Sequence, residues 1–223
     1  MDVYRTEEEQ IEALKRWWQE NGKSLLIGIV LALMAVYGYK GWENHKQSEG
    51  EAASNIYFDL MDAVSIAEQN PNDENSATIN HLVAQLKTDY TNSTYAIYAA
   101  LIAAKQAVVK DELTTAEQEL QWALTKTEKG TSIYLITQLR LARVIFAQGG
   151  EDNAKRALAL LEGPVAASHS ASYEEAKGDI YVSLGRLDEA RSAYLKAIAD
   201  AESSGVQRPL LQIKLNDLAQ GDS

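Results

Sequence analysis

The chain has 223 residues, of which 46% are hydrophobic and 24% charged, and its formal net charge is −11. This apolar fraction argues against a disordered chain, and the negative charge removes the attraction to phosphate on which nucleic-acid binding depends. The absence of cysteine excludes disulfides, thiol catalysis and cysteine-ligated metal sites.

Residues 1–23 are expected to form a short cytoplasmic tail that contains an amphipathic helix. Thr6 and Glu9 have the spacing of a capping box, which predicts a helix start. One side of that helix would be apolar, with Ile11, Leu14, Trp17 and Trp18. Two interpretations stay open: a helix lying on the membrane surface, or a straight extension of the spanning helix. Asn21-Gly22 is a possible position for a bend between this helix and the span.

Residues 24–42 are predicted to cross a membrane. No charge occurs from Ser24 to Tyr39, and Lys23 and Lys40 flank this run. Sixteen helical residues cover roughly 24 Å, somewhat less than the hydrocarbon core of about 30 Å, and flanking lysines can extend that reach. The alternatives are a buried core helix and a cleaved signal peptide, but six acids before the run and the missing A-x-A-like site argue against cleavage.

The basic residues around the span predict its orientation. They are Arg5, Lys15, Arg16 and Lys23 before it, and Lys40 and Lys46 after it. The excess on the first side favours a cytoplasmic N-terminus, which would place the rest of the chain in the periplasm of a Gram-negative cell. Within the span, Gly28 and Ala32 are four residues apart, a spacing that allows close packing against another membrane helix and that also occurs by chance.

After a polar linker at 43–50, residues 51–223 are predicted to form a tetratricopeptide-like solenoid of helical hairpins. Small and aromatic residues recur in three segments, and the anchoring alanines Ala116, Ala154 and Ala190 are separated by 38 and 36 residues. Small residues are needed where the two helices of a hairpin cross closely. A final helix after Gly205 and Pro209 is expected to cap the open end. The predicted fold class is therefore all-α, with a transmembrane helix followed by this solenoid.

No pattern in the chain indicates catalysis. The histidines His45, His81 and His169 have no metal-ligand spacing, and no phosphate-binding loop or nucleophile motif occurs. Neighbouring acids point about 100° apart on a helix, so they predict solvated faces and no catalytic pair. We therefore predict no catalytic residue, no metal, no cofactor and no enzyme activity.

The remaining candidate for function is the concave surface of the solenoid, which in such repeats commonly binds a segment of another protein. The first helix of each hairpin would supply Tyr98, Leu101, Lys105, Ile136, Leu139, Arg143, Asp179 and Val182. Alternatively, the apolar members of this set pack inside the domain. A shift of one residue in the assumed helical register would exchange the concave-facing residues for the core-facing ones.

The chain resembles the YfgM family of ancillary SecYEG translocon subunits over nearly its whole length. The resemblance is carried by KRWWQENGKSLLIGIV around the span, by TNSTYAIYAALIAAKQAV, and by the segment from Leu139 to Val144. It implies an inner-membrane protein with a periplasmic repeat domain that associates with SecYEG and the periplasmic chaperone PpiD. It also implies a link to the regulator RcsB on the cytoplasmic side, and it supplies no catalytic residue.

The leading hypothesis is a translocon-associated scaffold that assists newly translocated envelope proteins by protein–protein binding. Tethering beside the channel raises the local concentration, so a weak interface suffices. The alternative is a scaffold that organises the cell envelope or the division machinery.

Overall fold

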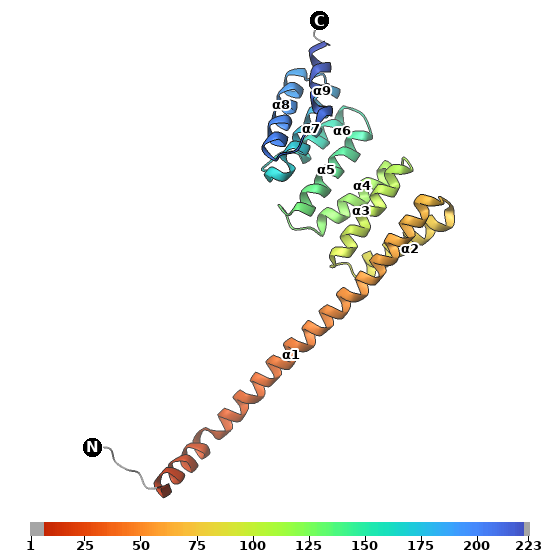
Figure 1. Ribbon diagram of the computed structural model, residues 1–223. Coiled ribbons are helices and arrows are strands. Elements are labelled where there is room, and N and C mark those ends of the chain that lie inside the picture. Colours follow the sequence, from red (N-terminus) through yellow and green to blue (C-terminus); the bar gives the residue numbers. More distant parts are fainter. Residues whose placement is uncertain (1–6, 221–223) are drawn as a thin grey trace, which may run out of the picture. The chain divides into compact units, whose positions relative to one another are not determined.

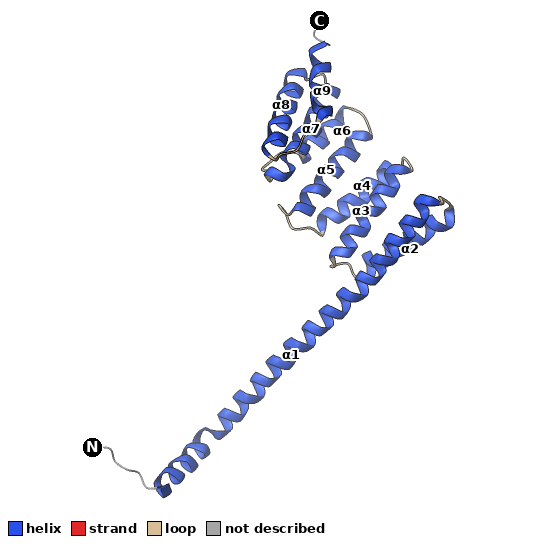
Figure 2. Cartoon of the chain, viewed as in Figure 1, coloured by secondary structure: helices blue, strands red, loops and turns tan. Residues whose placement is uncertain are grey.

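The computed structural model describes residues 7–220, and this part of the chain contains helices and turns but no strand (Figure 2). Nine helices follow one another over these residues (Figure 1). They are α1 (Glu7–Gln69), α2 (Asp73–Asp89), α3 (Thr94–Val109), α4 (Leu113–Thr125), α5 (Ser132–Ala147), α6 (Glu151–Leu160), α7 (Ala167–Ser183), α8 (Leu187–Ser203) and α9 (Pro209–Gln220). The predicted all-α fold class is confirmed.

The chain divides at Ala53 into two compact units, and α1 runs from the first unit into the second. The helix is unbroken at Asn21-Gly22, where the sequence allows a bend: the Asn21 side-chain amide donates to the Trp17 carbonyl oxygen at 3.1 Å. Residues 43–50, expected as a linker, are also helical. Of the expected capping box, Thr6 lies outside the described residues.

The break between α1 and α2 follows from Pro71, which disfavours a helical conformation at the residue before it. The Asn72 side chain then accepts a hydrogen bond from the Asn75 backbone N–H at 2.7 Å and caps α2. Beyond Ala53, α1 packs with α2 and α3 around the buried Leu60 and Leu86. The C-terminal part of α1, together with α2, therefore belongs to the same domain as the predicted repeats and precedes them in the chain.

Three helical hairpins follow, as the repeat pattern predicts. The helices of each pair, α3 with α4, α5 with α6 and α7 with α8, pack directly on one another (Figure 1). The anchoring alanines Ala116, Ala154 and Ala190 are all buried, at the crossings for which the sequence predicts small residues. In the last hairpin the two helices approach so closely that a Cβ added at Gly178 would overlap the ring of Tyr194.

The turn of the first hairpin differs from the turns of the other two in lacking a glycine. The turns after α5 and α7 place Gly149 and Gly185 in left-handed conformations, with φ of 77° and 70°. In the turn after α3 the corresponding conformation is adopted by Asp111, with φ of 60°. Aspartate tolerates this region better than most residues, so the turn forms without the glycine by which such turns are recognised.

The helix α9 covers the apolar side of α8 at the end of the domain. Its Leu211 and Leu218 are buried against Ala190, Tyr194 and Ala197. A terminal hairpin would otherwise leave this surface exposed to water.

Candidate protein-binding site

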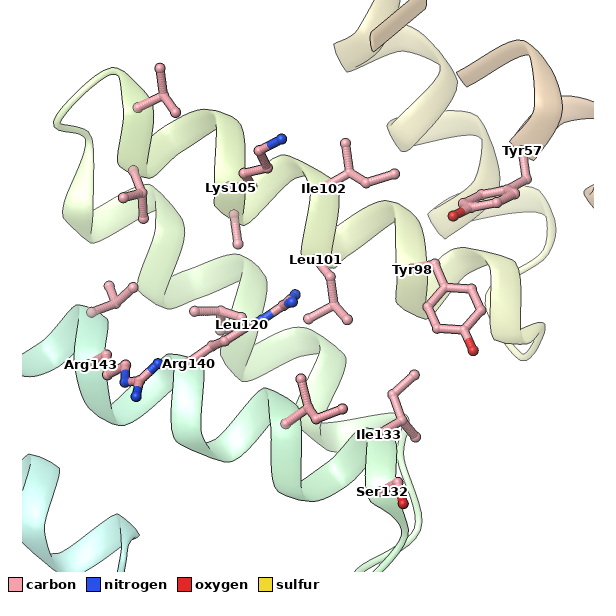
Figure 3. A pocket seen from close by; sticks show the side chains of 15 residues that line it. Tyr57, Tyr98, Leu101, Ile102, Lys105, Leu120, Ser132, Ile133, Arg140 and Arg143 are labelled. Carbon is pink, nitrogen blue, oxygen red and sulfur yellow. The ribbon is translucent and has the colours of Figure 1, made fainter. Parts of the chain in front are cut away.

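A cavity of about 720 Å³ lies between α3 and α5, the first helices of neighbouring hairpins (Figure 3). Most of its wall is apolar, and its charged side chains are Lys105, Arg140 and Arg143. The complete lining is Tyr57, Tyr98, Leu101, Ile102, Ala104, Lys105, Val108, Val109, Leu120, Ser132, Ile133, Ile136, Arg140, Arg143 and Val144. None of these residues is acidic, although the chain has 32 Asp and Glu residues.

Five of the eight residues predicted for the concave surface come together around this cavity. Tyr98, Leu101 and Lys105 lie on α3, and Ile136 and Arg143 lie on α5. Figure 3 shows the labelled side chains on α3 and α5, with Leu101 of α3 and Arg140 of α5 extending into the space between the two helices. Their grouping agrees with the predicted surface, while their role in binding stays a prediction.

The sequence prediction missed Arg140, although a signal for it was present. Ile133, Ile136, Arg140 and Arg143 follow a spacing of three, four and three residues, which places them on one face of α5. Tyr57 was also missed, because it belongs to α1 and only the fold brings it beside Tyr98, with ring centroids 6.0 Å apart.

Leu139 has to be removed from the predicted surface. It is only 8% exposed and belongs to the core cluster that also contains Leu135 and Tyr173. The interpretation as internal packing holds for this residue. Leu139 directly precedes the cavity residue Arg140, and adjacent residues of a helix point about 100° apart, so its side chain faces the core while that of Arg140 faces the cavity.

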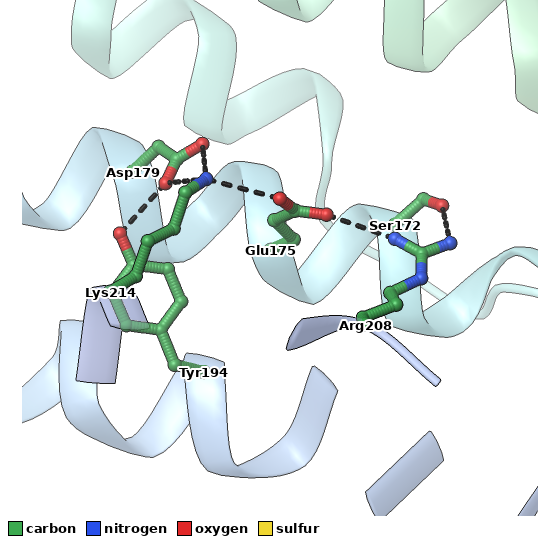
Figure 4. Close-up of polar contacts among 6 residues, drawn as sticks. All are labelled: Ser172, Glu175, Asp179, Tyr194, Arg208 and Lys214. Atoms are coloured by element: carbon green, nitrogen blue, oxygen red, sulfur yellow. Dashed lines mark hydrogen bonds and ion pairs between the residues drawn. The ribbon is translucent and has the colours of Figure 1, made fainter. Parts of the chain in front are cut away.

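Asp179 and Val182 lie on α7 and do not line the cavity. Val182 is 39% exposed, whereas Asp179 is engaged by the end of the domain (Figure 4). Lys214 of α9 reaches both carboxylate oxygens of Asp179, at 2.7 and 2.8 Å, and the Tyr194 hydroxyl donates to Oδ1 at 2.7 Å. Asp179 therefore holds α9 in place and is not free for a partner.

The same network continues along α7 through Glu175, which pairs with Lys214 at 3.1 Å and with Arg208 at 2.9 Å (Figure 4). Burial alone would lower the pKa of Lys214, but its hydrogen bonds to Asp179 and Glu175 outweigh that effect and raise it. Burial, followed by the hydrogen bond to Asp179, raises the pKa of Tyr194 above its ordinary value. Lys214 stays charged and Tyr194 neutral over the physiological pH range.

Around the cavity the charges are less completely paired. Lys105 forms an exposed ion pair with Glu68 at 2.9 Å. Arg140 and Arg143 form no ion pair with any residue in the described part of the chain, and both are exposed. Burial, with the neighbouring Tyr98 and Tyr95, raises the pKa of Tyr57, so the hydroxyl of Tyr57 stays neutral over the physiological pH range.

The N-terminal part of α1 carries the second predicted surface. It is long and apolar enough to cross a membrane, and 6% of its most apolar stretch is buried. This exposure argues against the alternative of a buried core helix. An added Cβ at Gly28 would meet no atom within 4 Å, so nothing in the described chain covers the face that Gly28 shares with Ala32.

The family model described as a tetratricopeptide repeat-like domain matches residues 15–220. Three full-length relatives carry the name ancillary SecYEG translocon subunit. The Haemophilus influenzae protein is 33% identical, with 97% of this chain and 100% of the relative covered. For the Escherichia coli protein the identity is 31%, with 98% and 100% covered, and for the Neisseria gonorrhoeae protein 29%, with 98% and 100% covered.

This chain belongs to the family of ancillary SecYEG translocon subunits. The resemblance carried by the span and by the segment from Tyr95 to Val108 is thereby confirmed. No solved structure matches the chain.

Family membership and the repeat-like domain point to a non-catalytic protein. Over residues 7–220, no three His, Cys, Asp or Glu side chains come together in a way that could hold a metal ion. The cavity between α3 and α5 offers apolar walls and cations, which suit recognition of another protein.

Proposed function

We propose that this translocon-subunit relative is a membrane-anchored scaffold that associates with a SecYEG translocon and binds partner proteins in the cavity between α3 and α5. The observation that supports it most is the identity of 31–33% to named translocon subunits over nearly the full length of both chains. The exposed apolar helix supplies an anchor, and the cavity supplies a surface that no described residue of the chain occupies.

In this proposal residues 1–23 lie in the cytoplasm, residues 24–42 cross the inner membrane, residues 43–50 connect, and residues 51–223 form the periplasmic domain. The excess of basic residues before the span supports this orientation. Because the chain has no cysteine, single cysteines introduced at Ser48 and Ser203 can be labelled specifically. A membrane-impermeant maleimide should label both in intact spheroplasts, and labelling only after lysis would contradict the orientation.

The proposed role is to assist newly translocated envelope proteins together with a periplasmic chaperone such as PpiD, without catalysis by this chain. A link of the cytoplasmic tail to RcsB is part of the same proposal, and both partners come from the family resemblance. Anchoring beside the channel raises the local concentration of the cavity, so a modest affinity is sufficient.

The test is purification of the full-length chain in mild detergent, followed by identification of co-purifying proteins. SecYEG subunits and a periplasmic chaperone are the expected result, and recovery of neither would contradict the proposal. Gly28→Ile, which adds bulk to the open face of the span, should reduce recovery of SecYEG if this face packs on a translocon helix. Ile27→Leu, at an exposed position beside it, is the matched control.

The alternative, a scaffold that organises the envelope or division machinery, predicts a different distribution in the cell. A fluorescent fusion distributed evenly over the membrane favours the translocon scaffold, and a focus at the septum or pole favours the organiser.

A further inference from the structure

We infer that the cavity between α3 and α5 binds a protein segment in which apolar side chains alternate with carboxylates, and that Arg140 and Arg143 bind the carboxylates. This inference deepens the proposed function and depends on it in one respect, namely that the occupant is a protein.

The apolar part of the ligand follows from the walls of the cavity. Val109, Tyr98 and Ile136 are 74%, 40% and 36% exposed, so large apolar side chains face water where the cavity opens. Burying such surface under an apolar ligand is favourable. Since these apolar side chains of the lining stay open to water, a ligand that covers them has to reach the open side of the cavity.

The length of the lined stretch also suits a protein segment. Lining residues run from Tyr98 to Val109 on α3 and from Ser132 to Val144 on α5. At ~1.5 Å per helical residue, each stretch covers roughly 17 Å. An extended segment of about five residues, at ~3.3 Å each, would cover the same length.

The carboxylates of the ligand follow from charge complementarity. All three charged side chains in the lining are cations, in a chain whose net charge is −11. Arg140 and Arg143 are one turn apart on α5, and no described acid neutralises them. A guanidinium group binds a carboxylate through two parallel hydrogen bonds, so two adjacent arginines select an acidic segment over a neutral one.

The test uses the full-length chain in phosphatidylcholine nanodiscs and fluorescently labelled peptides of twelve residues. The first peptide alternates Leu or Phe with Asp or Glu, and the second replaces every Asp and Glu by Asn and Gln. The third keeps the acids and replaces the apolar residues by Ser. Because a hydrogen bond to a charged group contributes more than a neutral one, the first peptide should bind about ten-fold more tightly than the second. The advantage should shrink as salt is added.

The double variant Arg140→Gln/Arg143→Gln should remove that advantage and leave binding of the amide peptide unchanged. The matched control is Lys129→Gln/Lys155→Gln, which removes the same charge from two exposed residues outside the lining and should leave all three affinities unchanged. Circular dichroism would confirm that both variants keep their helix content.

Equal affinity of the acidic and amide peptides would overturn the inference, as would unchanged binding by the double arginine variant. Equal binding of the serine peptide would overturn the apolar part. Displacement of the first peptide by phosphatidylglycerol added to the nanodiscs would overturn it in favour of a lipid site. If these peptides fail to bind while SecYEG still co-purifies, only the inference of an acidic ligand for the cavity is contradicted. If they bind and no translocon component is recovered, only the proposed association with the translocon is contradicted.

Discussion

Two neighbouring gaps between hairpins differ in this domain, although the same kind of repeat builds both. Between α3 and α5 the chain leaves a cavity with exposed apolar and basic side chains. Between α5 and α7 the helices pack directly, and Tyr173 of α7 is only 1% exposed there. Its hydroxyl lies 2.8 Å from the Leu135 carbonyl oxygen and 3.0 Å from Gln138 Oε1. A large side chain from the next hairpin thus fills the second gap, whereas the first gap remains an open cavity.

The largest expected effect comes from removing that side chain. Tyr173→Ala should lower the free energy of unfolding by about 3–5 kcal/mol, since it leaves a cavity in a packed core. Tyr98→Ala, at the open gap, should cost only about 1 kcal/mol, because its partly exposed ring loses little beyond its contact with Tyr57. Urea unfolding followed by circular dichroism measures both, and equal losses would show that the two gaps do not differ.

A smaller effect is expected at the close approach of α7 and α8 in the last hairpin. Gly178→Ala should destabilise the domain by about 1–3 kcal/mol, because the new Cβ overlaps the buried Tyr194 ring, which its bond to Asp179 holds in place. Gly50→Ala is the matched control, a helical glycine with no atom within 4 Å of the added Cβ. Gly50→Ala should instead stabilise its helix by up to about 1 kcal/mol. If both substitutions changed the free energy of unfolding in the same direction, the close contact at Gly178 would be contradicted.

The packing of Tyr173 in the filled gap can be tested at high pH. Burial raises the pKa of Tyr173 from 10.0 to about 12. Its contribution to stability is complete below pH 10, where the unfolded tyrosine is still protonated, and is lost as the pH rises through the folded pKa. At pH 11 the wild type should have lost about 1.4 kcal/mol more than Tyr173→Phe, which cannot ionise. Parallel stability curves for the two proteins between pH 9 and 11 would contradict this.

The smallest expected effect is that of the hydroxyl itself. At neutral pH, Tyr173→Phe should cost about 1 kcal/mol, the usual net contribution of one buried hydrogen bond. Thermal unfolding of the two proteins in the same detergent is sufficient to measure it. No measurable loss would mean that filling the gap, and not the bond to α5, stabilises the contact.

The fold could be predicted because its signals are local. Apolar residues recur at helical spacing, Pro71 ends α1, and Ala116, Ala154 and Ala190 mark close crossings, all of which can be recognised within one segment. The cavity could be predicted only in part, because its shape depends on which side chain of the next hairpin enters each gap. The predictions for Tyr98 and Ile136 were therefore compatible with the structure, while Leu139 proved to be core.

The exposure of Asp179 also could not be predicted from the residues near it in the sequence. Its position on the first helix of a hairpin predicts an accessible carboxylate, but Lys214, 35 residues later, pairs with it. Such pairing depends on where α9 returns in space, and no spacing within α7 indicates it.

The most direct test of the account is photo-crosslinking in living cells from two positions of similar exposure, Ile136 at the cavity and Val182 on α7. A benzoylphenylalanine at 136 should form adducts with a translocon component or an envelope chaperone, through a segment in which acids and apolar residues alternate. The same group at 182 should not form them. Adducts of equal yield from both positions, or none with these proteins from 136, would contradict the assignment of the cavity as the binding surface.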